Sequence, residues 1–412
     1  MKKIYYGWVI CAACFLEMFL TAGLTANTYA SYQPYLISVV GLSNTQASLL
    51  ATIRNLTGFL AMLGATAFFG RLNLRLGMTV SVSICVLSYL VYSVADGFGV
   101  CAVAAALAGV GSALGGAVSL AHLLSRWFKD RMGLAMGLST AGSGISSILA
   151  SPLIEKSIHR FSLSATYRGQ ALVMLVLGTV VFLLVRNDPR SMGQKPYQSG
   201  KKEEKPRAEV PAEAGVDRLG LTVAMISIFL LGGAAAAFAH YSVLYISVGM
   251  DSAKVASMLA IGGFALTVGK LVYGAVVDSV GIARSNFIFF GLTIIGFAIS
   301  CFARSATVFS MYISYGVLNF GLPLTTMGQS LWARMLSSPE DYPKNLNRFQ
   351  SIYLAGSMVS GVVPGMVADL TGSYVPAFVL FTVTTALCFG GIVFACDRKK
   401  RGFRREDNAA DV

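Results

Sequence analysis

Residues 99–125 read GVCAVAAALAGVGSALGGAVSLAHLLS, and this stretch contains no Asp, Glu, Lys or Arg. A hydrocarbon core about 30 Å thick needs roughly 20 apolar residues of helix to cross it. Backbone exposed to lipid must satisfy its own hydrogen bonds, so an apolar run of this length is expected to be helical. The stretch therefore predicts a membrane-spanning helix.

Eleven other segments share this apolar character, and most of the connections between them are short. The twelve predicted spans are 6–29, 45–69, 78–96, 99–125, 132–154, 168–186, 219–247, 253–277, 285–303, 306–332, 347–369 and 373–396. The sequence therefore predicts an all-α polytopic membrane protein with twelve transmembrane helices.

The composition of the whole chain agrees with this prediction. Residues A, V, I, L, M, F, W, Y and C make up 55% of the 412 residues, charged residues only 12%, and mean hydropathy is +0.67. A soluble chain carries about a quarter charged residues. The composition excludes a soluble enzyme, a nucleic-acid-binding domain and a secreted disulfide scaffold. The sequence has no P-loop, HExxH or paired-carboxylate motif, so we expect neither an enzyme nor a metal or other cofactor.

One long polar connection, residues 187–218, divides the chain. It includes the run KKEEKP at 201–206, and such polar, proline-bearing sequence is typical of a flexible linker. We therefore predict an N-terminal six-helix half over 1–186 and a C-terminal half over 219–396. A basic cytoplasmic tail is predicted to follow at 397–412.

The positive charges indicate how the chain lies in the membrane. If the N-terminus is cytoplasmic, the inner segments hold 25 Lys and Arg and the outer loops hold 5, while Arg54 and Lys270 lie within spans. Inner loops of membrane proteins carry such an excess of Lys and Arg. We therefore expect both termini to be cytoplasmic, in the cell (inner) membrane. The net charge of +13 then needs no nucleic acid partner, and the expected partner of the surface is the lipid bilayer. We expect a monomer.

The two halves repeat a short motif. Residues 70–77, GRLNLRLG, follow the second predicted span, and residues 274–281, GAVVDSVG, follow the eighth, which is the second span of the C-terminal half. Both octads begin and end with glycine. Two parallel six-helix halves around a central cavity are a known plan of secondary transporters.

These octads resemble the loop signature of the major facilitator superfamily, G-x-x-x-D-R/K-x-G. The first copy has Leu74 at the position of the acid, and the second has Ser279 at the position of the cation. The resemblance implies the major facilitator fold and a conformational latch on its cytoplasmic side. The expected latch residues are Gly70, Arg75, Gly77, Gly274, Asp278, Gly281 and Arg126.

A second motif supports a narrower resemblance. Residues 126–137 read RWFKDRMGLAMG, and residues 6–8, YGW, open the first span. Together they are similar to the monocarboxylate porter and oxalate/formate antiporter branch of the superfamily, across the layout of all twelve helices. That resemblance implies a secondary active transporter of a small organic anion, a monocarboxylate, working by alternating access. The coupled partner would be a proton in symport or a counter-anion in exchange.

Ionisable residues inside a span are costly and usually functional. Lys270 lies in the eighth span, four residues before Gly274. The resemblance implies that it is the cation that binds the substrate carboxylate, although the branch usually has Arg there, which binds a carboxylate bidentately. The alternative is a lysine whose ammonium reaches the cytoplasmic interface.

Arg54 and Glu17 are the other two charges at membrane depth. Arg54 lies 16 residues before Gly70, roughly 24 Å along a helix. It is either a second cation facing the cavity or a partner for Glu17. Glu17 lies near the middle of the first span, where a low dielectric disfavours the charged form of a carboxyl group. It is either a proton-coupling acid or a structural glutamate, protonated or in a fixed salt bridge.

Two histidines are further candidates for proton coupling. His122 and His240 lie in the fourth and seventh predicted spans, and histidine changes charge near neutral pH. The alternative is that both are hydrogen-bonded packing residues.

The resemblance also implies further substrate contacts. The branch's second cation, on helix 11, corresponds to Tyr353 here, and its aromatic positions on helix 10 correspond to Tyr315 and Asn319. Its aromatic positions on helices 4 and 5 correspond to Ala117 and Ser143. One cation with Tyr315, Asn319 and Tyr353 suits a monoanion with a hydroxyl or a small apolar tail. The alternative for these three side chains is core packing or contact with lipid.

The sequence is also compatible with a second class of function. A proton-coupled efflux pump for lipophilic or cationic compounds would need an acid in the membrane, and Glu17 is available. Two membrane cations, Lys270 and Arg54, against this one acid favour the anion transporter.

Overall fold

The computed structural model describes residues 5–128, 132–197, 218–337 and 341–410. This part of the chain is almost entirely helical, and its one β-bridge joins Phe128 to Tyr197. Eleven of its helices are long and apolar enough to cross a membrane. The predicted fold class, an all-α polytopic membrane protein, is confirmed.

Contacts group the chain into two compact units. The first comprises Met1–Lys205 and Met250–Phe264, and the second comprises Pro206–Gly249 and Ala265–Val412. The helices up to residue 197 are α1 (Gly7–Met18), η1 (Phe19–Asn27), α2 (Tyr29–Ser38), α3 (Asn44–Arg71), α4 (Leu74–Ser93), α5 (Phe98–Leu114), α6 (Ala117–Trp127), α7 (Met132–Thr140), α8 (Gly142–Arg160), α9 (Leu163–Leu184) and η2 (Pro189–Met192). The later helices are α10 (Arg218–Ala235), η3 (Ala236–His240), α11 (Tyr241–Ser247), α12 (Ser252–Ser300), η4 (Ala303–Ser305), α13 (Val308–Gly321), η5 (Leu324–Gly328), α14 (Gln329–Leu336), α15 (Tyr342–Ser360), α16 (Val363–Thr371) and α17 (Val375–Ala410).

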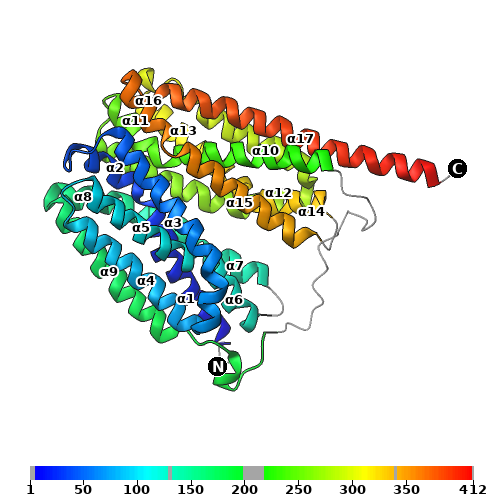
Figure 1. Cartoon of the computed structure of the whole chain (residues 1–412), viewed down its shortest axis with the longest axis horizontal. Coiled ribbons are helices and arrows are strands. Elements are labelled where there is room, and N and C mark those ends of the chain that lie inside the picture. The colour runs from blue at the N-terminus through cyan, green and yellow to red at the C-terminus, as the bar shows by residue number, and fades with distance from the viewer. Residues whose placement is uncertain (1–4, 129–131, 198–217, 338–340, 411–412) are drawn as a thin grey trace. The chain divides into compact units, whose positions relative to one another are not determined.

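Within the first unit, α4 packs against α5 and α9, while α3 packs against α5 (Figure 1). Serine hydroxyls join α4 to α5: Ser81 Oγ donates to the carbonyl of Gly111 at 2.7 Å, and Ser88 Oγ donates to the carbonyl of Ala104 at 2.7 Å. Small residues and such hydrogen bonds are the usual means of helix association in lipid, where no hydrophobic force acts between helices.

The first span is longer than predicted. It covers 7–38 rather than 6–29, because the π-helical segment η1 continues into α2. The polar residues of α2 are buried rather than placed in a loop; Tyr32 Oη, for example, donates to Gln170 Oε1 at 2.5 Å. Wide π-helical turns occur often at functional sites.

The tenth predicted span, 306–332, is not one continuous helix. It divides at Pro323 into α13, the π-helical η5 and α14. Proline has no amide hydrogen and its ring crowds the preceding turn, so a straight α-helix is interrupted there. This division is why eleven rather than twelve single helices satisfy the length needed to span a membrane.

The eighth and ninth predicted spans are joined by a very short connection. They form the two parts of α12, Ser252–Val277 and Ser279–Ser300, and the chain turns sharply at Gly281, whose φ is 80° and ψ is 166°. A side chain is strained at such a positive φ, so glycine suits this turn.

The structure describes only part of the predicted linker and of the predicted C-terminal tail. Residues 198–217 of the predicted linker lie outside the described residues, as do 411–412 of the predicted tail. Tyr197 donates its amide to the carbonyl of Trp127 at 2.8 Å, so this end of the linker is held against the end of α6. The predicted tail continues α17 as a helix as far as Ala410.

Glycines let α10 and α15 approach closely in the second unit. A methyl carbon added to Gly356 would overlap the carbonyl oxygen of Phe229, and one added to Gly232 would overlap that of Tyr353. We expect Gly356→Ala to destabilise the protein by about 1–3 kcal/mol, because rigid backbone atoms would have to move apart. The melting temperature in detergent measures this effect. Gly291→Ala is the matched control in α12, since its added methyl meets no atom within 4 Å, and an equal loss there would contradict the packing argument.

Candidate functional site

Lys270 lies in the first part of α12, and its side chain is half-buried. Among the described side chains, the one pair of opposite charges within ion-pair distance is Glu155 with His159. Lys270 therefore has no acidic partner in that part of the chain. An ionisable residue within a span is costly and usually functional.

The two sides of α12 at Lys270 differ. On one side, a methyl carbon added to Gly269 would lie 2.6 Å from the carbonyl oxygen of Phe320, so α12 and α13 touch closely. On another side, one added to Gly274 would meet only Met327 Cε, at 3.9 Å. The α12 surface at Gly274, one turn after Lys270, is therefore less tightly packed than the surface at Gly269.

Tyr315 and Asn319 lie on α13 and are both nearly buried, with 8% and 5% of their surface exposed. Asn319 Nδ2 donates to the backbone carbonyl of Tyr315 at 2.8 Å, and the Tyr315 ring lies 4.8 Å from the ring of Tyr241. Because Phe320 packs against Gly269, Asn319 and Lys270 lie next to the residues at which their two helices touch.

Tyr353 lies on α15, against the hydrophobic core of the second unit. This core includes Trp332 and Phe349, and the backbone of Tyr353 packs directly on Gly232. Tyr353 thus packs on this core while part of its surface stays exposed.

Arg54 lies on α3, in the first unit. Its Nη1 donates to the backbone carbonyl of Ala26 at 3.1 Å, and its guanidinium carbon lies 5.4 Å from the ring centre of Tyr29. Ala26 belongs to the π-helical segment η1. A carbonyl and an aromatic face both stabilise a cation without neutralising it.

A small cavity adjoins Arg54, and all of its lining residues belong to the first unit. They are Thr25, Tyr29, Tyr32, Leu50, Arg54, Tyr89, Tyr92, Ala108 and Tyr167. The ring of Tyr167 stacks on Tyr32 at 4.3 Å and on Tyr92 at 5.2 Å. The volume is about 10 Å³, which is room for about one water molecule. In this conformation the space beside Arg54 is too small for an organic anion.

Glu17 lies on α1 and is fully buried. No described residue donates a hydrogen bond to either carboxyl oxygen, and Glu17 is not in ion-pair distance of Arg54. A methyl carbon added to Gly115 would lie 2.6 Å from Glu17 Oε1, so the carboxyl group rests against the bare backbone at the end of α5. Burying a charged carboxylate without a partner is very costly, so the neutral acid is the form that fits this structure.

The two candidate histidines have different environments. His240 is fully buried; its Nε2 lies 3.2 Å from the carbonyl oxygen of Gly361, and its ring stacks beside Tyr374. This is the environment of a hydrogen-bonded packing residue. The side chain of His122, on α6, is exposed.

The expected latch residues lie in both units. Arg75, at the start of α4, donates from Nε to the carbonyl of Phe182 at 2.8 Å and lies over the Phe182 ring at 3.9 Å. A methyl carbon on Gly77 would lie 2.5 Å from the Phe69 ring. Arg75 therefore ties α4 to the end of α9. Gly70 lies in the last turn of α3, and Arg126 is exposed in the last turn of α6. The Asp278 side chain lies outside the described part of the chain.

The RWF motif anchors the end of α6. Trp127 Nε1 donates to the carbonyl of Arg186 at 3.0 Å, and its own carbonyl accepts from the hydroxyl of Tyr5 at 2.7 Å. The rings of Tyr5, Trp8 and Phe128 pack together at the same place. The motif's Trp and Phe thus hold the start of α1 and the segment after α9. Residues 129–131 of the motif lie outside the described residues.

One polar cluster, which joins Tyr35, Glu155 and His159, is not among the residues predicted from the sequence. Glu155 and His159 fall beyond the predicted end of the fifth span at 154, but α8 continues to Arg160. Tyr35 falls beyond the predicted end of the first span at 29 and lies on α2. The available signal was an acid and a histidine four residues apart, a spacing that places both on one face of a helix.

Comparison with known proteins supports the fold and the family. The family model of the Major Facilitator Superfamily matches residues 14–331. Two crystal structures of the nucleoside transporter NupG have TM-scores of 0.72 and 0.71 at 13% identity, covering 94% and 95% of this chain and 99% of theirs. At this identity the likeness concerns the fold alone.

Relatives found by sequence are 22–26% identical to this chain. Monocarboxylate transporter 12 of Mus musculus is 22% identical, over 96% of this chain and 87% of its own length. Monocarboxylate transporter 13 of Rattus norvegicus is 26% identical over 66% of this chain, which spans 62% of that relative. Agnestins efflux protein AgnL12 of Paecilomyces divaricatus is 24% identical, over 73% of this chain and 66% of its length. The chain belongs to the major facilitator superfamily, and is a membrane transporter rather than an enzyme.

Proposed function

We propose that this protein is a secondary active transporter of a small organic anion, a monocarboxylate, working by alternating access. The observation that carries the proposal is Lys270, a cation within the apolar α12 that has no acidic partner in the described part of the chain. Two relatives carry the name monocarboxylate transporter, which supports the same ligand class.

In this proposal the Lys270 ammonium attracts the carboxylate. Tyr315 and Asn319, on the helix that touches α12 beside it, and Tyr353 contact the rest of the substrate. Arg54 acts as a second cation once the conformation opens the cavity beside it. That opening is required because the present cavity holds about one water molecule.

Glu17 is our first candidate for the residue that carries the proton coupled to transport. A buried carboxyl group without hydrogen bond or cation is neutral in this state, and hydration in another state would release its proton. His122 and His240 are secondary candidates, and anion exchange is the alternative mode of coupling.

We further propose that both termini are cytoplasmic, in a cell (inner) membrane, and that the monomer is the working unit. The distribution of 25 inner against 5 outer Lys and Arg supports this orientation. Under this topology, two six-helix halves move about the linker 187–218. The octads with Gly70, Gly77, Gly274, Asp278 and Gly281 and the nearby Arg75 and Arg126 form the cytoplasmic latch.

A second candidate function is a proton-coupled efflux pump for lipophilic or cationic compounds. The similarity to an efflux protein and the buried, unpaired Glu17 favour it. Lys270 disfavours it, because an unpaired cation repels a cationic substrate.

One experiment separates the two candidates. Purified protein in proteoliposomes is tested for uptake of labelled small monocarboxylates, dicarboxylates and cationic dyes under an imposed pH gradient. We expect saturable uptake of a monocarboxylate and no movement of dye. Dye transport without carboxylate transport would replace the proposal with the efflux function.

A further inference from the structure

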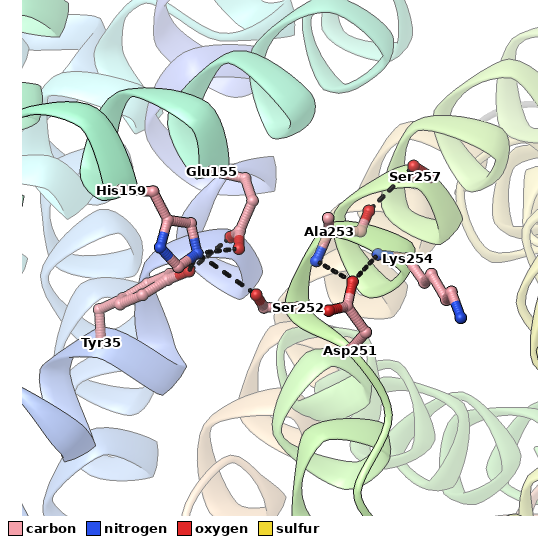
Figure 2. Close-up of polar contacts among 8 residues, drawn as sticks. All are labelled: Tyr35, Glu155, His159, Asp251, Ser252, Ala253, Lys254 and Ser257. Carbon is pink, nitrogen blue, oxygen red and sulfur yellow. Dashed lines mark hydrogen bonds and ion pairs between the residues drawn. The ribbon is translucent and has the colours of Figure 1, made fainter.

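A polar cluster brings together three helices of the first unit, at the ends of α2 and α8 and the start of α12 (Figure 2). Its members are Tyr35, Glu155, His159 and Ser252, which we call the Glu155–His159 cluster. Ser252 belongs to the segment Met250–Phe264, which groups with the first unit although the rest of α12 does not. The cluster thus lies at the start of the part of α12 that groups with the first unit.

The contacts centre on a carboxylate and an imidazole. Glu155 Oε1 lies 2.8 Å from His159 Nε2, and Glu155 Oε2 accepts a hydrogen bond from Tyr35 Oη at 2.6 Å. His159 Nε2 also lies 3.3 Å from Tyr35 Oη and 3.4 Å from Ser252 Oγ. Both carboxyl oxygens of Glu155 therefore have a hydrogen-bond partner. The Nε2 atom of His159 faces Glu155, Tyr35 and Ser252.

The cluster is arranged so that a proton can reach it. Glu155 is buried, whereas 63% of the His159 side chain is exposed. For Nε2 to contact a carboxylate at 2.8 Å it must carry hydrogen, which it does in the imidazolium and in one of the two neutral tautomers. Histidine is the side chain whose charge changes most readily near neutral pH.

The surrounding charges act on the imidazolium in both directions. Two acids favour the imidazolium form of His159: Glu155 on the same helix and Asp251 before α12. The carbonyl end of α8 also favours this form, because His159 lies in the last turn of that helix. Lys156 and Arg160 on α8, both exposed, and Lys254 on α12 oppose it. Tyr35 is the one titratable group that α2 contributes to the cluster. The bound carboxylate at 2.8 Å is the closest charge, so protonation strengthens the cluster.

Ser252 makes the longest of the contacts. At 3.4 Å its hydroxyl is held weakly by a neutral imidazole and more strongly by a cation. The later part of Met250–Phe264 packs closely on α8. A methyl carbon added to Gly263 would lie 2.9 Å from the carbonyl oxygen of Gly144 in α8. The first turn of α12 is therefore the part whose attachment depends on His159.

We propose that the Glu155–His159 cluster is a proton-binding site that fastens the first turn of α12 to α2 and α8, tightly when His159 is protonated and loosely when it is neutral. Acid is expected to favour the fastened arrangement, because a carboxylate attracts an imidazolium more strongly than a neutral imidazole. The site is distinct from Glu17 and from Lys270. The proposal does not depend on which substrate the protein transports.

Hydrogen exchange of the full-length protein in nanodiscs tests the proposal. Exchange of amides in 252–258 is compared between wild type and His159→Gln at pH 5.5 and at pH 8. The ratio between the two proteins at each pH cancels the intrinsic pH dependence of exchange. We expect wild type to be protected about two- to five-fold more than the variant at pH 5.5, as for an exposed ion pair, and nearly equally at pH 8. An equal ratio at both pH values would overturn the proposal.

Two further variants keep the test decisive if His159→Gln folds poorly. Ser252→Ala removes the hydroxyl that lies 3.4 Å from His159 Nε2 and that also interacts with Tyr35, and should abolish the extra protection at pH 5.5. Glu155→Gln keeps a hydrogen-bond acceptor but removes the charge, and should make protection independent of pH. Asp96→Asn, which changes an exposed charge between α4 and α5, is the matched control and should leave the wild-type pattern intact. Wild-type behaviour of Ser252→Ala and Glu155→Gln would refute the role of the cluster.

Discussion

Lys270→Ala is expected to lower monocarboxylate uptake about thirty-fold or more while leaving the protein folded. Removing one partner of a buried charge pair costs about 2–5 kcal/mol, and here the missing partner is the substrate carboxylate. The fold should persist because no described acid pairs with Lys270, so no charge is left without a partner in the empty protein. Initial uptake rates in proteoliposomes and the melting temperature in detergent measure the two effects.

Two variants define what the lysine contributes. Lys270→Arg keeps the charge, and should retain part of the uptake with a changed preference among carboxylates, since guanidinium binds bidentately. Lys344→Ala removes an exposed lysine of α15, and should match wild type. Normal uptake by Lys270→Ala would show instead that this ammonium serves only as an interfacial charge, the alternative of a lysine reaching the cytoplasmic interface.

The spans were predictable because lipid allows few solutions. A run of about 20 apolar residues has to be a helix, so eleven of the twelve predicted segments correspond to single candidate spans. The errors occur where polar residues continue or interrupt a helix. The first span extends through Tyr32 and Gln33, and the fifth through Glu155, because neighbouring helices bury these side chains. The tenth is divided because Pro323 stands within its apolar run.

The charged positions were predictable, but their partners were not. Lys270, Arg54 and Glu17 stand out in the sequence because ionisable residues are rare in spans. A sequence does not show that Arg54 bonds to the carbonyl of Ala26 rather than to Glu17, because η1 sets that geometry. Nor does it bring Tyr35 to Glu155, which lies 120 residues away.

Glu17→Gln is expected to abolish accumulation driven by a proton gradient while preserving exchange of substrate across the membrane. Glutamine has the shape of the protonated acid but never releases a proton, so the cycle would run without coupling. Stability should change by about 1 kcal/mol or less, because Glu17 has no hydrogen bond or ion pair in the described structure that the change would break. Breaking a buried ion pair would cost about 3–5 kcal/mol, so the melting temperature alone distinguishes a free carboxyl group from a hidden salt bridge.

The transport measurement compares two modes in the same proteoliposomes. Wild type and Asp96→Asn, which alters an exposed acid between α4 and α5, should both concentrate substrate when the outside is acidic, and both should exchange it at equal pH. Glu17→Gln should retain only the second activity. Proton-driven accumulation by this variant would exclude Glu17 as the carrier and direct attention to His240, whose imidazole is as fully buried as the Glu17 carboxyl. The reason to expect otherwise is that Glu17 rests against Gly115, where no side chain separates the acid from the backbone of α5. A small displacement of α5 from α1 would admit water to the carboxyl group, and a hydrated carboxyl group releases its proton.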